Sequence, residues 1–203
     1  MPLSSGVRDG IATAIFAGTT HVAVLDTAAA EIAGGTYARQ AATFATTANV
    51  ADNDAEEVWT IPGGNEAGWY AGYDAGAAGN QTWRWPIQGN TLTEAQRLPY
   101  EAVAEADDEI LYARAHPFTT GDRVVLFNKA GAAMPTGLTE AVFYWVVGAN
   151  ATGFQVSLTE GGAAVNVTAD GRCWAVRAIP ETFGDDGTLT LPAGGLDGLG
   201  TVL

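Results

Sequence analysis

The sequence is poor in the residues that build most redox and metal sites. Its 203 residues include one cysteine, Cys173, and two histidines, His21 and His116. A single cysteine cannot form a disulfide within the chain, and there is no histidine–cysteine cluster that could hold zinc. Stability must therefore come from the hydrophobic core, and cysteine usage leaves the redox compartment undetermined.

Positive charge is also scarce. Nine lysines and arginines face 23 aspartates and glutamates, so the net charge is −14, and Lys129 is the only lysine. A field of this sign repels the phosphates of nucleic acids and of anionic membrane surfaces. We therefore expect neither nucleic acid nor a membrane as a partner.

Long apolar runs and cofactor motifs are missing as well. No stretch approaches the roughly 18 apolar residues of a membrane span. Residues 1–18, MPLSSGVRDGIATAIFAG, lack a basic leader ahead of a long apolar core. No glycine-rich phosphate motif precedes a helical pattern. We expect no membrane span, no secretion signal and no cofactor.

Hydrophobic residues and glycine, by contrast, are plentiful. The chain is 47% hydrophobic and contains 26 glycines. Burying each large apolar side chain stabilises a fold by roughly 1.5–3 kcal/mol, so a core of this size needs no disulfide or metal. The glycine content suits tightly turned β-structure better than long helices.

One helix is expected, at the N-terminus. Ser4 or Ser5 can cap its start, and Gly18 can end it. Between them the apolar residues recur at helical spacing. This stripe can pack on its own domain or dock on a neighbouring subunit. Its members are Val7, Ile11, Ala14 and Ile15.

The next segments have the residue pattern of β-strands. Between residues 21 and 87, short apolar stretches are separated by turn signals such as PGGN (62–65). In TWRWPI (82–87), Trp83, Trp85 and Ile87 fall on one face, and Thr82 and Arg84 on the other. We predict a mainly β protein, with a β-sandwich-like base domain that carries the N-terminal helix.

Residues 91–106 are more polar, and we interpret them as a linker. Beyond them, apolar strands recur every eight to twelve residues, the rhythm of a small sandwich or barrel. In FQVSL (154–158), alternation predicts Phe154 and Leu158 on the core face and Ser157 on the solvent face. We predict a discontinuous base domain (1–106 and 179–203) and an inserted β domain (107–178) whose ends lie close together.

The stretch HPFTTGDRVVLF (116–127) can be interpreted as the edge of an active site or as the start of a strand. The proline after His116 favours extended backbone, and Thr120, Gly121 and Asp122 have the composition of a tight turn. We prefer the turn. The alternative requires His116, Asp122 and Cys173 to line one pocket.

Other catalytic candidates are weak. None of the three serines lies in a sharp-turn motif, and Cys173 lies in a β pattern typical of a buried, inert thiol. The acidic runs 51–57, 105–109 and 184–187 could supply a glycosidase with carboxylates, but solvated turns account for them better. DNDAEE (52–57) lacks the glycine and the last acid of a calcium loop, and calcium at this turn is kept as a minor alternative. We expect no catalytic activity.

A group of aromatic residues could form a sugar-stacking platform if it were exposed. Strand alternation instead favours a place in the core. The residues are Trp69, Tyr70, Tyr73, Trp83 and Trp85.

The first ninety residues also carry an ordered series of motifs. Arg8 and Asp9 lie in the expected helix, and GGTYARQ (34–40) follows a strand and an acidic loop. This order resembles the opening of small virion proteins of tailed bacteriophages, of the tail-fibre or minor-tail type. Residues 68–87 resemble that family's next two strands, and residues 181–197 its closing strand.

The chain departs from the family in one place. Relatives pass directly from the WPI segment to the closing strand, whereas residues 107–178 intervene here. These residues resemble a small β-module of phage structural proteins. The matching segments are 116–125, 135–138, 144–147 and 154–158.

The resemblance implies a non-enzymatic virion component, present in several symmetric copies. Our leading hypothesis places it in the tail, tail fibre or baseplate, with the tail favoured over the capsid surface. It would assemble as a homo-oligomer, with a trimer favoured, beside other virion proteins. A capsid decoration protein, a host-glycan-binding module and a polysaccharide hydrolase are alternatives. The glycan module would use Trp69, Tyr73, Trp83 and Trp85. Candidate subunit contacts are Val7, Ile11, Ile15, Leu196, Leu199 and Leu203.

Overall fold

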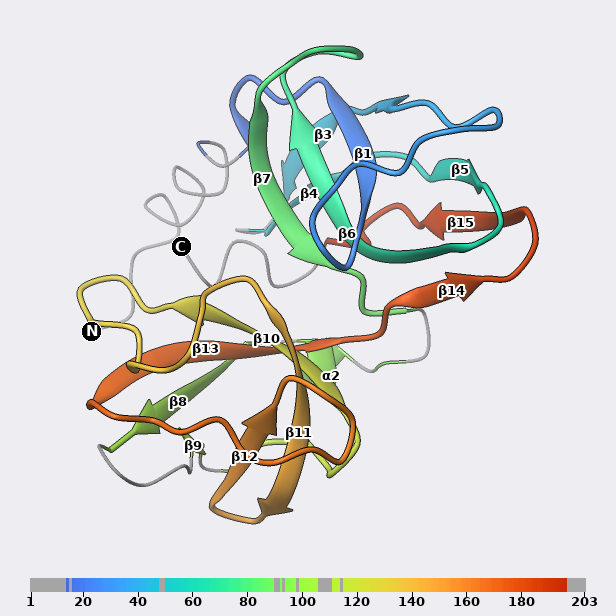
Figure 1. Ribbon diagram of the computed structural model, residues 1–203. Coiled ribbons are helices and arrows are strands. Elements are labelled where there is room, and N and C mark those ends of the chain that lie inside the picture. The colour runs from blue at the N-terminus through green and yellow to red at the C-terminus, as the bar shows by residue number, and fades with distance from the viewer. Residues whose placement is uncertain are drawn as a thin grey trace. The chain divides into compact units, whose positions relative to one another are not determined.

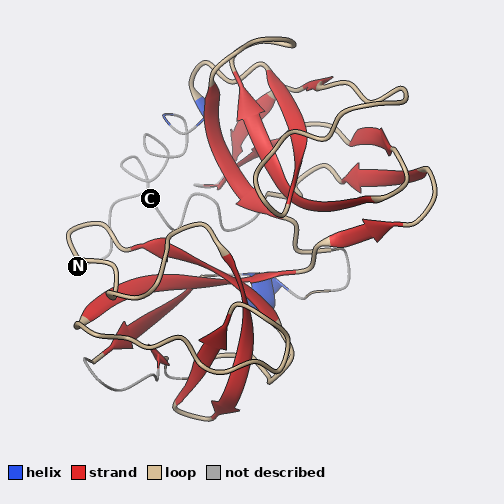
Figure 2. Cartoon of the chain, in the orientation of Figure 1, coloured by secondary structure: helices blue, strands red, loops and turns tan. Residues whose placement is uncertain are grey.

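The computed structural model describes most of the chain as two compact β units (Figures 1 and 2). The described residues up to Ile87 and from Pro180 onward form the base unit, and those from Gln88 to Ile179 form the barrel unit. None of the described helices is long and apolar enough to cross a membrane. The described residues are 14, 16–47, 50–89, 92, 94–97, 99–105, 111–113 and 115–196.

A five-stranded antiparallel sheet forms the centre of the base unit. Strand β6 lies in its middle and pairs with β1 along one edge. The other edge of β6 pairs first with β14 and then with β7. The strands are β1 (His21–Asp26), β2 (Gln40–Ala41), β6 (Asn65–Tyr73), β7 (Gln81–Pro86) and β14 (Glu181–Phe183).

Strands β7 and β14 follow one another along the same edge of β6. Pro86, the last residue of β7, is opposite Trp69, and Glu181, the first residue of β14, is opposite Ala67. Both strands run antiparallel to β6. They therefore form one edge strand that the barrel unit interrupts, with a gap of about 7 Å between its two parts at about 3.3 Å per residue.

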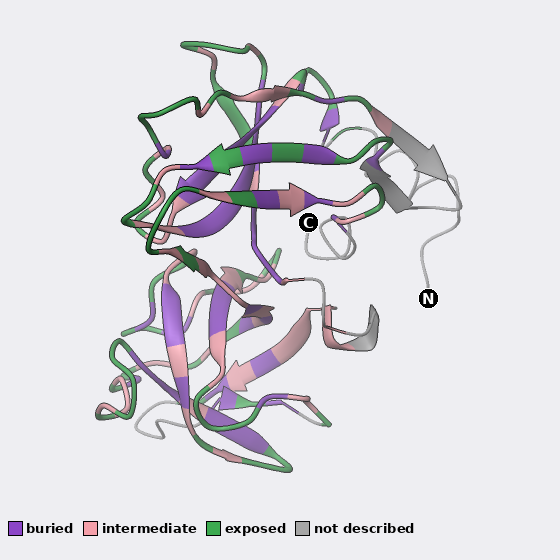
Figure 3. Ribbon diagram, turned by 90° about the vertical axis from the view of Figure 1, so that its right-hand side faces the viewer, coloured by how far each residue is buried: buried purple, intermediate pink, exposed green. Residues whose placement is uncertain are grey.

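Two two-stranded antiparallel ribbons complete the base unit. One is the hairpin of β3 (Phe44–Thr47) and β4 (Val50–Asn53), and the other pairs β5 (Glu57–Ile61) with β15 (Gly187–Leu191), which is distant in the sequence. Buried and exposed residues alternate along β5 (Figure 3). Trp59 and Ile61 are among the buried ones and face inward. The Trp59 ring lies 5.7 Å from the Tyr70 ring, and the Tyr70 hydroxyl donates to the Thr190 carbonyl at 3.2 Å. The ribbon thus packs over a face of the central sheet.

Alternation along β7 agrees with the sequence. Trp83, Trp85 and Ile87 are buried, whereas Thr82 is exposed and Arg84 is half-buried. The prediction of a mainly β fold is confirmed. The predicted N-terminal helix lies outside the described residues, apart from its last turn, and it stays a prediction.

The barrel unit is a closed antiparallel barrel with the order β10-β11-β12-β9-β8-β13. Closure pairs both edges of the sheet with one another. A short helix, α2 (Glu94–Arg97), precedes it. The strands are β8 (Tyr100–Ala104), β9 (Leu111–Tyr112), β10 (Arg123–Asn128), β11 (Phe143–Asn150), β12 (Gly153–Ser157) and β13 (Gly171–Ala178).

The first and last parts of the barrel unit meet, as an insertion requires. The Gln88 side chain donates to the Arg177 carbonyl at 3.1 Å, and β8 pairs with β13. The ends of the segment that begins at Gln88 therefore lie close together. The predicted bounds of the insertion, 107–178, begin at a residue outside the described ranges and stay a prediction.

Two details of the sequence interpretation are wrong. Residues 100–104, assigned to a linker, form β8 in the barrel, and Ala102 and Ala104 are buried in its core. Leu158, expected in the core, is 64% exposed, whereas Ser157 is 2% exposed. The reason is that β12 ends at Ser157, whose hydroxyl accepts the Thr159 amide at 3.2 Å and bends the chain away.

Candidate functional site

The polar connection ahead of β10 is tied to β13 by an ion pair. The Arg177 guanidinium donates to both carboxylate oxygens of Asp122, at 3.0 and 2.6 Å, and to the Pro117 carbonyl at 2.6 Å. Asp122 also accepts the Thr119 amide at 2.6 Å. Because both carboxylate oxygens are occupied, Asp122 holds the turn together and anchors it to the barrel wall.

His116 has a structural role beside this turn. Its ring stacks on Phe118, with centroids 5.5 Å apart, and meets Phe154 edge-on at 5.2 Å. Its Nδ1 accepts the Phe118 amide at 3.1 Å. In this arrangement Nδ1 is the unprotonated nitrogen of the ring.

The three side chains of the active-site alternative do not converge. Cys173 faces the barrel interior, four residues before Arg177 on β13, which separates their Cα atoms by about 13 Å. Asp122 is engaged by Arg177, and His116 by Phe118 and Phe154. The interpretation of residues 116–127 as a turn and a strand is confirmed.

Burial makes Cys173 unreactive. It raises the pKa of the thiol to about 12, and only the thiolate is nucleophilic. We expect maleimide to label the native protein at pH 8 about a thousandfold more slowly than an exposed cysteine of pKa about 8.5. Intact-mass spectrometry over time measures this. Protein unfolded in urea should react fully, and equal rates in both states would contradict the burial.

The aromatic group lies in the core of the base unit. Trp69, Tyr70, Tyr73, Trp83 and Trp85 are between 0% and 9% exposed. Their predicted core location is confirmed. The hypothesis that Trp69, Tyr73, Trp83 and Trp85 stack on glycans is wrong, because a sugar needs an exposed ring face and β6 is covered on both faces.

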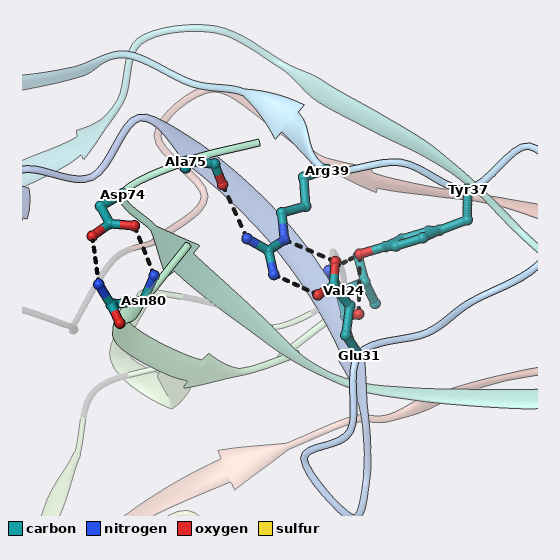
Figure 4. A network of polar contacts seen from close by, with 7 residues as sticks. All are labelled: Val24, Glu31, Tyr37, Arg39, Asp74, Ala75 and Asn80. Carbon is teal, nitrogen blue, oxygen red and sulfur yellow. Dashed lines mark hydrogen bonds and ion pairs between the residues drawn. The ribbon is translucent and has the colours of Figure 1, made fainter. Parts of the chain in front are cut away.

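The GGTYARQ motif places a charged network over one end of the central sheet (Figure 4). Arg39 donates to both Glu31 oxygens, at 2.9 and 2.7 Å, and to the Ala75 carbonyl at 3.0 Å. Its guanidinium lies 3.5 Å from the centre of the Tyr73 ring. One side chain therefore joins the loop before β2 to the loop after β6.

Tyr37 fixes the same loop to β1. Its hydroxyl accepts the Val24 amide at 2.7 Å and donates to the Val24 carbonyl at 3.2 Å (Figure 4). Burial raises the pKa of the Tyr37 phenol above its usual range. The hydrogen bonds to Glu31 raise the pKa of the Arg39 guanidinium. Tyr37 thus stays a neutral phenol and Arg39 stays a cation, as their contacts in this network require. The GGTYARQ motif therefore stabilises the fold by fixing its loop to the central sheet.

Replacing Arg39 with lysine is expected to lower the free energy of unfolding by about 1–2 kcal/mol, because an ammonium cannot make the paired contact to Glu31 and also reach the Ala75 carbonyl. Urea denaturation followed by tryptophan fluorescence measures the change. The matched control is Arg172→Lys, since Arg172 is 57% exposed and has a single 3.3 Å contact to Glu101. A similar loss in the two variants would contradict the proposed role.

The acidic runs have mixed roles. In the first run, the Asn53 amide donates to the carbonyls of Ala55 and Pro192, at 2.7 and 2.9 Å. In the third, Asp186 accepts the Gly63 amide at 2.9 Å. Of the second run only Glu105 is described. Within the described ranges, no group of three or more histidine, cysteine, aspartate or glutamate side chains is arranged to hold a metal ion.

Glu57 is the residue that sequence reasoning missed. The acidic composition of residues 51–57 places it in a solvated turn. In the structure Glu57 is 8% exposed and faces inward from β5, like Trp59 and Ile61. Burial raises the pKa of its carboxyl. The signal was present in EVWTI (57–61), where alternation places position 57 on the core face. Glu57 lines a hollow of about 770 Å³ in the base unit.

Most candidate subunit contacts lie outside the described residues. These are Val7, Ile11, Ile15, Leu199 and Leu203, and they stay predictions. Leu196 is described and is 1% exposed. It is therefore covered by its own chain and offers no free apolar surface to a neighbouring subunit, which corrects the expectation for this residue.

Comparisons of the chain with protein-family models, with curated proteins and with solved structures found no match.

Proposed function

We propose that the protein is a structural, non-catalytic component of a bacteriophage virion, in the tail, its fibre or the baseplate. It would assemble as a homo-oligomer beside other virion proteins. The observation that carries the proposal is the interrupted edge strand of the base unit. Strands β7 and β14, which contain the WPI segment and the start of the closing segment, follow one another along β6. This is the arrangement expected if relatives of the resembled type pass directly from one to the other.

The charge distribution also supports this role. Arg8 and Arg114 lie outside the described residues, and all seven of the other lysines and arginines make contacts within the chain. Acidic side chains therefore dominate the free charge of the described surface, which favours solubility and opposes random self-association. The seven are Arg39, Arg84, Arg97, Arg123, Lys129, Arg172 and Arg177.

The oligomer is tested by size-exclusion chromatography with light scattering. The chain mass is 20.9 kDa, and we expect a small whole-number multiple of it, with a trimer favoured. Dilution into the micromolar range should leave this mass unchanged. A stable monomer at micromolar concentration would contradict the assembly that the proposal requires.

The position in the particle is tested by electron microscopy of purified phage that encodes the chain. Gold-labelled antibodies against the protein are expected to decorate the tail or its tip. Label over the head would instead favour the capsid decoration alternative. If mass spectrometry of purified particles finds no peptide of the chain, the virion proposal fails.

A further inference from the structure

The hollow beside Glu57 combines apolar walls with one acidic group. It has a volume of about 770 Å³, within the range of sites that bind ligands. Its lining is mostly alanine, threonine and phenylalanine, with His21 and Glu57 as the titratable side chains. All of these residues belong to the base unit. The hollow is open to solvent, so a segment of another molecule can enter it.

The Glu57 carboxyl lacks a compensating partner among the described residues. It is 8% exposed, and burial is the cause of its raised pKa. The carboxylate oxygens of Glu57 are not among the fully buried, unpartnered polar atoms of the described residues, so they reach the solvent in the hollow. Position 57 would hold a hydrophobic residue in an ordinary strand of this pattern, as positions 59 and 61 do. Such a conflict between pattern and residue is typical of binding sites.

Aromatic rings stand in the same wall. Phe16 and Phe44 both line the hollow, and their rings stack with centroids 4.3 Å apart and an interplanar angle of 10°. Trp83 meets both rings edge-on, at 5.4 and 6.1 Å, and its indole donates to the Thr19 hydroxyl at 3.2 Å. Trp83, itself fixed by its hydrogen bond to Thr19, therefore restricts the movement of the Phe16 and Phe44 rings.

A carboxylate and aromatic rings in one hollow favour a cation. Carboxylates form their strongest hydrogen bonds with ammonium and guanidinium groups, and aromatic rings attract the same groups. The apolar lining suits the methylene stem of a lysine or arginine and the hydrophobic residues beside it. The net charge of −14 adds a long-range attraction for a basic partner.

We propose that this hollow is a docking site for a peptide segment of a partner protein, in which a lysine or arginine lies between apolar residues. The basic side chain pairs with Glu57, and the apolar neighbours contact the half-buried Phe44 and the alanine and threonine side chains of the lining. The inference concerns the base unit alone, and it stands whether or not the protein belongs to a virion.

The test compares two peptides that differ only in charge. Acetyl-Phe-Lys-Phe-amide and its counterpart with norleucine in place of lysine are titrated into the full-length protein at pH 7, by calorimetry and by amide chemical shifts. We expect the lysine peptide to bind about tenfold more tightly, as one charged contact implies. The shifts should centre on Thr19, Thr20 and His21.

Two variants then test whether the Glu57 carboxyl causes the preference for the lysine peptide. Glu57→Gln is expected to bind both peptides equally, whereas Glu56→Gln, the same charge change at the exposed neighbouring position, should keep the tenfold preference. Circular dichroism checks that both variants fold. Equal binding of the two peptides by the unaltered protein, no binding of either, or a preference that survives in Glu57→Gln would overturn the site. Hexylammonium, a simple alkyl cation, is titrated as a further probe. If it binds as tightly as the lysine peptide, the site does not recognise a peptide segment.

Discussion

Replacing Arg177 with methionine is expected to lower the free energy of unfolding by about 2–4 kcal/mol, less than the full cost of breaking a buried ion pair, because this pair is partly buried. The side chains of Arg177 and Asp122 are 12% and 18% exposed. Without the guanidinium, Asp122 is left as an uncompensated charge, and the Pro117 carbonyl loses its donor. Urea denaturation at pH 7, followed by tryptophan fluorescence, measures the loss.

A matched control lies on the same strand. Arg172 is 57% exposed, and its partner Glu101 keeps a 2.6 Å contact with Lys129 when Arg172 is removed. Arg172→Met should therefore cost less than about 1 kcal/mol. The double variant Asp122→Leu with Arg177→Met should recover part of the loss, because no buried charge is then left alone. Equal losses in Arg177→Met and Arg172→Met would show that the anchor is unimportant.

Gly137→Ala is expected to cost about 3 kcal/mol or more, from two sources that add. The backbone of Gly137 has φ of +105°, a region that residues with a side chain rarely adopt. A β-carbon there would also collide with the carbonyl oxygen of Asn166. That oxygen belongs to the backbone beside Val167, which is buried in the barrel core, so it cannot move aside cheaply.

The control for Gly137 separates backbone strain from collision. Gly131 has φ of +77° and open space around its α-carbon. Gly131→Ala should cost about 1–2 kcal/mol, from the left-handed backbone alone. Thermal unfolding of the two variants beside the parent protein measures both effects. If Gly137→Ala is no less stable than Gly131→Ala, the close approach of residues 137 and 166 is not tight in solution.

The sequence predicted the strands best where large residues alternate with polar ones. Trp83 and Trp85 are a clear case, because burying two indoles on one face leaves little choice of orientation. Strand β8 was not predicted from the sequence, because its inward residues, Ala102 and Ala104, are small and are flanked by acidic residues. Its place is decided by closure of the barrel between β9 and β13, and local composition does not encode such a long-range pairing.

The same distinction holds for the polar sites. The turn at Asp122 could be predicted because its signal lies within a few neighbouring residues. Its partner Arg177 could not, since the two are brought together by the register of β10 and β13, which pairs Val124 with Arg177. Glu57 was predictable from alternation within β5, but the acidic composition around it suggested a solvated turn instead.

The interrupted edge of β6 has a consequence for the gene. The chain leaves that edge after Pro86 and regains it at Glu181, opposite positions only two residues apart on β6. After a deletion in frame between these points, a short extended link could join β7 to β14 without disturbing the pairing on either side. One recombination event could thus acquire or discard the whole intervening cassette, and shorter descendants of this gene would keep an unbroken sheet.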